Sequence, residues 1–150
     1  MKQLVKIAMG LMLLMMPVTL FAQNASEARK TLKDYCEVKN AECPIKDGED
    51  AYYLLFAFED DQMNIIYGVG TDTFAALGKN KNALLKAVND ELKTNEELLG
   101  IIAFLSECKG TLAFIFCDYN GDIADENNRL LVGFEKDDLL ELIKQVQEEE

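Results

Sequence analysis

Oxygen-bearing side chains are concentrated in one short stretch of the sequence, residues 118–128. They are Asp118, Asn120, Asp122, Asp125 and Glu126. Calcium requires oxygen ligands in groups of roughly six to eight, and the first three residues have the 1-3-5 spacing of a helix-loop-helix calcium loop. Such a loop also needs a glycine and a later glutamate, where this sequence has Ile123 and Arg129. The stretch therefore predicts either a calcium site of another kind or an acidic hairpin loop that turns at Asn120-Gly121.

Four cysteines form the second group that could carry chemistry: Cys36, Cys43, Cys108 and Cys117. In an exported chain they would suggest disulfides, and four cysteines allow three connectivities. Cys108 and Cys117 flank an apolar stretch. At about 3.3 Å per residue, a strand there would hold them beyond the roughly 7 Å limit for bonded Cα atoms. A Cys36–Cys43 bridge is feasible, and buried free thiols or a pairing between the two halves are the alternatives. The spacings are unusual for a zinc site, and no Cys-x-x-Cys redox motif occurs.

The sequence contains no histidine. It therefore lacks the commonest general base and the usual ligand of zinc and copper, which excludes Ser-His-Asp and Cys-His catalysis. An enzyme of this sequence would have to use carboxylates or a free cysteine. We expect the protein not to be an enzyme.

The first 22 residues have the organisation of a secretory signal peptide. Lys2 and Lys6 precede an apolar run over residues 7–16, Pro17 interrupts it, and Leu20-Phe21-Ala22 ends in a small residue. The run is shorter than the about 20 residues of a membrane span, which disfavours the alternative of an uncleaved anchor. We predict cleavage after Ala22 and a bacterial protein that is periplasmic or secreted.

The predicted mature chain, residues 23–150, is long enough for a single α+β domain. Its net charge is −14, because removal of Lys2 and Lys6 takes two positive charges from a chain of net charge −12. No basic cluster is left, which argues against nucleic acid and anionic membranes as partners. A cationic peptide, a basic protein surface or a metal cation would suit this charge, and solubility alone is the alternative explanation.

Hydrophobic periodicity predicts the elements that position these residues. Helices are expected over 25–38, 80–93 and 136–147, with another that starts at a Thr94-x-x-Glu97 capping box and ends near Gly110. Strands are expected over 52–58, 63–69, 111–117 and 129–134. The order α-β-β-α-α-β-β-α predicts a four-stranded, mostly antiparallel sheet of two β-hairpins with helices chiefly on one face. Strands 52–58 and 111–117 are apolar on both sides and belong in the middle of the sheet, whereas 63–69 belongs nearer an edge.

The second faces of those two central strands predict a binding surface. Its residues are Tyr53, Leu55, Ala57, Ala113 and Ile115. Contiguous apolar patches often mark interaction surfaces, although one of the helices could cover this one instead. We expect an exported, non-enzymatic binding module whose apolar sheet face is framed by acidic loops. Its partner would be a second copy in a dimer, another envelope protein or a peptide.

Two resemblances accompany these patterns. The Cys43-Pro44 step before the first hairpin and the glycine-led strand at Gly110-Thr111-Leu112 resemble a group of small exported bacterial proteins of unknown function. The order of elements is also similar to the secretion-chaperone-like fold, whose members are small, acidic and often dimeric. The first resemblance implies export and no activity, and the second implies dimerisation.

Overall fold

A computed structural model describes residues 25–149 of the chain. The signal peptide predicted at residues 1–22, with its cleavage point after Ala22, lies outside the described residues. Among the helices of residues 25–149, none is both long enough and apolar enough to cross a membrane.

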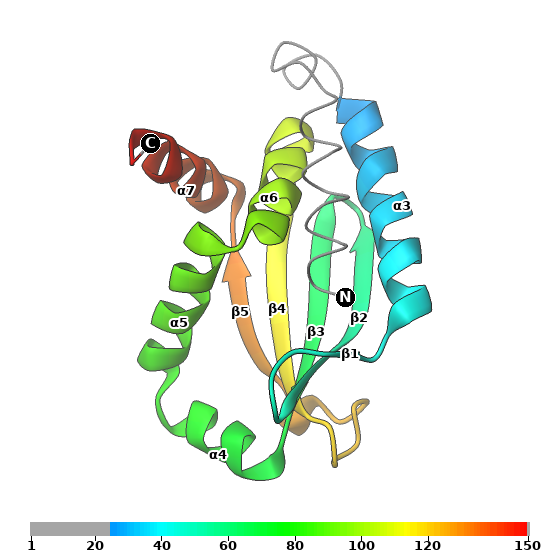
Figure 1. Cartoon of the computed structure of the whole chain (residues 1–150), viewed down its shortest axis with the longest axis vertical. Coiled ribbons are helices and arrows are strands. Elements are labelled where there is room, and N and C mark those ends of the chain that lie inside the picture. The colour runs from blue at the N-terminus through cyan, green and yellow to red at the C-terminus, as the bar shows by residue number, and fades with distance from the viewer. Residues whose placement is uncertain (1–24, 150) are drawn as a thin grey trace.

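The described residues form one five-stranded sheet with five α-helices (Figure 1). The strands, in sheet order, are β1 (Ile45–Lys46), β2 (Ala51–Glu59), β3 (Gln62–Val69), β4 (Thr111–Asp118) and β5 (Leu130–Phe134). The helices are α3 (Ala25–Glu42), α4 (Thr71–Lys79), α5 (Lys81–Thr94), α6 (Glu96–Cys108) and α7 (Lys136–Glu148), and one 3-10 turn, η1 (Glu126–Asn128), precedes β5.

The prediction of a four-stranded, mostly antiparallel sheet was wrong. Strands β3 and β4 run parallel, with Ile65 beside Phe114, so the α+β sheet is mixed. Parallel pairing requires the chain to return to the end of the sheet where β3 began before β4 starts. The connection between the two strands contains α4, α5 and α6, which is long enough for this return. The fifth strand, β1, lies between the predicted helix 25–38 and the predicted strand 52–58, where no strand was predicted, and pairs with β2 at Tyr52 and Tyr53.

The prediction that residues 63–69 lie near an edge was also wrong, because β3 is the central strand of the sheet. On one face its side chains Met63 and Ile65 are completely buried. On the other face it carries small or polar residues, among them Asn64 and Gly68. Those residues lie on the face of the sheet that α3 and α6 leave uncovered, so they do not require an edge position.

Helices α3, α6 and α7 pack on the face that contains Met63 and Ile65. Helix α3 contacts β2 and α6, α6 also contacts β4, and α7 contacts α6 and β5. Figure 1 shows α6 across the upper half of the sheet, with α5 and α4 running down one side and around its lower end. The main core therefore lies between α3, α6 and the upper half of the sheet, and the lower half is framed more loosely by α4 and α5.

Helix α3 continues to Glu42, four residues beyond the predicted end at Val38. Its last turn is fixed by Asn40, whose side-chain amide donates to Phe56 O at 2.7 Å and whose Oδ1 accepts from Phe56 N at 2.8 Å. Strand β1 pairs with β2 only as far as Tyr53. The Asn40 side chain therefore supplies hydrogen-bond partners for the backbone N–H and C=O of Phe56, at the outer edge of β2 beyond the end of β1.

Helix α6 begins one residue later than the predicted capping box implies. Asn95, not Thr94, is the N-cap, and its Oδ1 accepts from the N–H groups of Glu97 and Leu98 at 3.0 and 3.2 Å. Thr94 is the last residue of α5, and its hydroxyl donates to Asp90 O. Asparagine is at least as good an N-cap as threonine, so the sequence Thr94-Asn95 allowed two starting points.

A candidate ligand-binding cavity

A cavity of about 460 Å³ opens between the lower half of the sheet and the α4–α5 segment. Its floor is formed by β2, β3 and β4, one wall by α4 and α5, and the opposite wall by the loop between β1 and β2. The residues that line it are Asp47, Glu49, Asp50, Ala51, Tyr53, Tyr67, Val69, Thr73, Leu77, Leu84, Ala87, Val88, Glu91, Leu98, Phe114 and Phe116. This volume is within the range of ligand pockets, roughly 300–1,000 Å³, and most of the lining is apolar.

Aromatic rings make up the floor of the cavity. Tyr67 meets the ring of Tyr53 edge-on at 5.0 Å between centroids and the ring of Phe116 at 5.5 Å, and Phe114 stacks on Phe116 at 6.4 Å. Such contacts give aromatic side chains defined positions. Burial raises the pKa of Tyr67 to about 12 and also raises that of Tyr53, and the carboxylate of Glu91 adds to both shifts. Both phenols are therefore neutral near pH 7.

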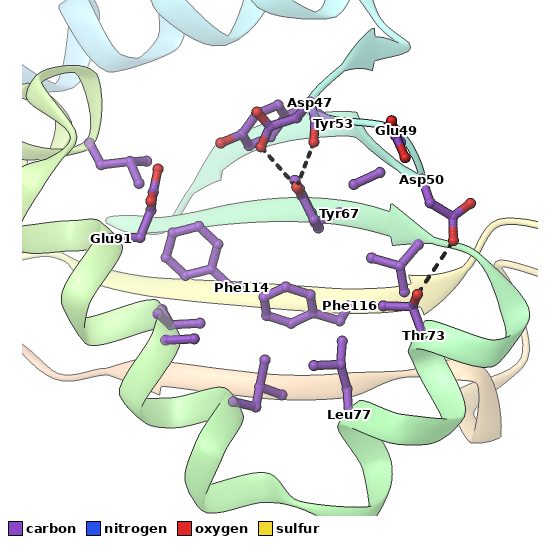
Figure 2. Close-up of a pocket in the computed structure, with 16 residues that line it drawn as sticks. Asp47, Glu49, Asp50, Tyr53, Tyr67, Thr73, Leu77, Glu91, Phe114 and Phe116 are labelled. Atoms are coloured by element: carbon purple, nitrogen blue, oxygen red, sulfur yellow. Dashed lines mark hydrogen bonds between the residues drawn. The ribbon is translucent and has the colours of Figure 1, made fainter.

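The rim of the cavity is acidic. Figure 2 shows Glu91 on one side and Asp47, Glu49 and Asp50 toward the other, with Phe114 and Phe116 on the floor between them. Asp47 accepts a hydrogen bond from the Tyr67 hydroxyl at 2.8 Å. No lysine or arginine is found among the described residues that line the cavity. The cavity is thus an apolar floor surrounded by four carboxylates.

Besides Asp47, two more of these carboxylates accept hydrogen bonds from hydroxyl or amide donors. Asp50 accepts hydrogen bonds from the hydroxyls of Tyr119 and Thr73, which join the β1–β2 loop to the end of β4 and to α4. The hydrogen bond to Asp50 raises the pKa of Tyr119. Glu91 accepts from the side-chain amide of Asn95 at 2.9 Å. Because these donors are neutral, the negative charge of the rim is not cancelled by them.

The predicted binding surface is divided by an irregularity in β2. The register shifts between Tyr53 and Leu55, so that Tyr53 pairs with Tyr67 while Leu55 pairs with Ile66. Tyr53 therefore lies on the helix side and lines the cavity. Leu55, Ala57, Ala113 and Ile115 lie together on the opposite face. The structure brings four of the five predicted residues together and places Tyr53 elsewhere.

No helix among the described residues covers that opposite face, which we call the open face. Leu55 is 42% exposed and Leu131, which pairs with Ile115, is 70% exposed. Gly68 lets Leu54 lie close over this face, because a Cβ on Gly68 would stand 2.8 Å from Leu54 Cδ1. The open face carries exposed apolar side chains, whereas the concave cavity lies on the other side of the sheet.

Sequence reasoning missed most of the cavity. Tyr67 and Phe116 were assigned to strands but not to a site, although both are aromatic residues on the same side of their strands as the core residues. The sequence contained a signal for this: Tyr67 lies two residues after Ile65, and Phe116 lies two residues after Phe114, so each pair shares one face of its strand. The apolar side chains of α4 and α5 that face them, such as Leu77 and Leu84, could not be placed without knowing where these helices cross the sheet.

None of the predicted calcium ligands lines the cavity: Asp118 is the last residue of β4, and the other four lie in the loop between β4 and β5. Three of the carboxylates accept hydrogen bonds from the backbone two residues later: Asp118 from Asn120, Asp122 from Ala124, and Asp125 from Asn127, at 2.9–3.0 Å. Asn128 closes the loop by donating to the carbonyls of Asp118 and Asp122. Within residues 25–149, no three acidic, cysteine or histidine side chains are grouped as metal ligands would be.

The calcium interpretation and this loop geometry make opposite predictions for thermal stability. We expect the melting temperature to stay constant as calcium is raised into the millimolar range, because the loop is already closed by its own hydrogen bonds. Saturation to a hundred times the Kd would add about 2.7 kcal/mol and raise the melting temperature by several degrees. If the melting temperature rose by that amount, and the rise disappeared in the Asp118→Asn/Asp122→Asn variant, the loop would be shown to bind calcium. Chelator-treated protein is the reference.

All four cysteines are free thiols in the structure. The Cys36 side chain faces the core, where its Sγ lies 3.6 Å from Met63 Sδ, and burial raises its pKa to about 11. Cys43 follows the end of α3 and is partly exposed. The predicted Cys36–Cys43 bridge is therefore not formed here, because the two residues lie in different environments.

Comparison with known proteins gives one similar fold. No protein-family model matches the chain, and no curated protein matches it. The crystal structure of a candidate secreted protein from Pseudomonas aeruginosa, at 1.60 Å resolution, is similar with a TM-score of 0.58 and 16% identity. The match covers 75% of this chain and 93% of the other. The chain therefore shares its α+β fold with a protein that is a candidate for secretion.

Proposed function

We propose that this protein is an exported, non-enzymatic binding protein that takes an apolar segment of a peptide or protein partner into its cavity. The observation that carries the proposal is the aromatic floor of a concave space of about 460 Å³, walled by α4 and α5. Concave, largely apolar sites with a few polar groups at their margin are typical of binding pockets.

Export is supported by two independent features. The first 22 residues have the basic, apolar and small-residue order of a signal peptide. The fold is similar to that of a candidate secreted protein from Pseudomonas aeruginosa. We propose a periplasmic or secreted protein on these grounds, with cleavage after Ala22.

The absence of catalysis is proposed from residue chemistry. The chain has no histidine, and both phenols of the cavity have raised pKa values and do not ionise near neutral pH. The remaining titratable groups of the lining are carboxylates at the rim. Binding needs none of these groups to react.

Filling the cavity tests the proposal. Ala87 is exposed on α5 and lines the cavity, so Ala87→Phe places a ring over the floor without disturbing the core. We expect the purified protein to enhance the fluorescence of the neutral dye Nile red, and this variant to weaken dye binding about tenfold, equivalent to about 1.4 kcal/mol. Ala75→Phe is the matched control, since Ala75 is exposed on α4 outside the cavity lining.

Dye binding at the open face is the outcome that would contradict the proposal. If Ala87→Phe bound the dye normally while Leu131→Asp lost it, the binding site would lie on the open face and not in the cavity. Thermal melting of all three variants checks that each is folded. Self-association through the open face is a separate proposal, which the molar mass of the protein in solution tests.

A further inference from the structure

We infer that α4 is a lid over the cavity, which swings away from the aromatic floor on a hinge at each of its ends and so admits the ligand. This inference rests on the proposed binding function for what enters the cavity. It adds the element that controls entry, and the movement of that element is measurable without a ligand.

Helix α4 is held to the rest of the described residues by little apolar packing. None of its nine residues is buried, and Leu77 is its side chain that packs against the main core. The next helix, α5, buries Leu84, Val88 and Leu92. Segments that bury few apolar side chains open at the lowest free-energy cost, so α4 is the part of the cavity wall most able to move.

Hollow space lies on two sides of α4. The cavity separates it from the floor of the sheet, and a second hollow of about 400 Å³ lies between α4 and α5. Thr73 and Leu77 of α4 line both spaces, and so do Leu84 and Ala87 of α5. Packed helices fill the space between them with side chains. The two hollows therefore leave α4 room to move.

The backbone leaves the helical conformation at a single residue on each side of α4. Gly70 precedes the helix with φ −65° and ψ 161°, and Asn80 separates it from α5 with φ −137° and ψ 77°. Hinges in proteins are typically a few residues at the ends of elements, which absorb the change in φ and ψ. Rotation at these two residues would move α4 as a rigid strap and carry Leu77 off the floor.

Two long hydrogen bonds hold α4 against the neighbouring loops. The Thr73 hydroxyl donates to Asp50 at 3.4 Å, and the side-chain amide of Asn120 donates to the Thr71 hydroxyl at 3.3 Å. Figure 2 shows the first of these bonds. The Asp50 carboxylate lies against Gly70, where an added Cβ would be 2.1 Å from Asp50 Oδ2. Glycine at this hinge therefore leaves room for the bond that closes the lid.

Methyl relaxation dispersion of the ligand-free protein tests the movement. We expect microsecond-to-millisecond exchange at the methyl groups of Leu77 and none at those of Leu139, which is completely buried on α7. Gly70→Ala displaces the Asp50 carboxylate and should raise the open population about three- to tenfold, because it breaks the bond to Thr73. Gly78→Ala is the matched control, since a Cβ there meets nothing within 4 Å. Flat dispersion at Leu77 would overturn the inference.

A reversible cross-link tests whether the movement controls entry. In a Cys43→Ser background, which removes the partly exposed thiol, Asp50→Cys/Thr73→Cys is joined by a short bis-methanethiosulfonate reagent that ties α4 to the β1–β2 loop. We expect Nile red to associate about tenfold more slowly with the tied protein, and reduction of the link to restore the rate.

The outcomes separate the lid from the proposed function. Equal association rates before and after reduction would overturn the lid, while dye binding itself would leave the cavity as the binding site. Failure of the dye to bind the tied, reduced and unmodified proteins alike would overturn the proposed function. The dispersion at Leu77, measured without dye, would still decide whether α4 moves.

Discussion

Replacing Lys39 with methionine is expected to destabilise the protein by about 3–5 kcal/mol, because it leaves the carboxylate of Glu97 buried without a counter-ion. Lys39 is 3% exposed on α3 and Glu97 is 8% exposed on α6. Lys39 Nζ lies 3.0 Å from Glu97 Oε1, and the Tyr35 hydroxyl donates to the same oxygen. This cluster joins α3 to α6, two of the three helices that pack on the sheet, and its loss is large against a typical total stability of about 5–15 kcal/mol.

Chemical denaturation at pH 7 measures the loss. The matched control is Lys39→Met/Glu97→Gln, in which no buried charge is left and the glutamine oxygen can still accept from Tyr35. We expect the double variant to recover most of the stability that the single variant loses, because removing both charges also removes their desolvation cost. Equal destabilisation of the two variants would show that packing of the lysine stem, and not the uncompensated charge, dominates.

Truncating Phe56 to alanine is expected to cost about 3–5 kcal/mol, whereas the same change at its neighbour Leu55 should cost less than about 1 kcal/mol. Phe56 is 2% exposed, its ring stacks on Tyr53 at 5.4 Å, and it meets Tyr35 edge-on at 5.7 Å. Leu55 points to the open face, where it is 42% exposed. The pair tests directly which face of β2 belongs to the core.

The measurement is the free energy of unfolding of the two variants under identical conditions. A cost at Leu55 that approaches the cost at Phe56 would mean that the open face is covered in solution, by a second copy or by another segment. Dilution distinguishes these cases, because the stability of a dimer depends on protein concentration.

The sequence by itself determined most of the local structure. Apolar runs bounded by turn residues located β2, β3 and β4, and the acidic turn at Asp60 and Asp61 joins β2 to β3 with positive φ angles at both residues. Helical periodicity located α5, α6 and α7 within a few residues. These features depend on neighbours in the chain, so propensity, capping and hydrophobic period are sufficient to find them.

Only the tertiary structure decided how the strands combine. The parallel pairing of β3 and β4 depends on where three consecutive helices return the chain, and strand β1 has only two residues, too few for a periodic signal. The face of each side chain in β2 was also undetermined. Leu54, Leu55 and Phe56 are all apolar, so a register shift of one residue cannot be detected from the hydrophobic pattern. The same shift changes which of these side chains face the core.

The candidate site illustrates the same division. The sequence contains the acidic residues of the β1–β2 loop, the aromatic residues of three strands and the apolar stripe of α5, but these lie up to several elements apart along the chain. Their meeting around one cavity depends on α4 and α5 crossing the lower half of the sheet while α6 covers only the upper half. Composition and periodicity fix which side chains are apolar, whereas the space left between packed elements is set by how those elements pack.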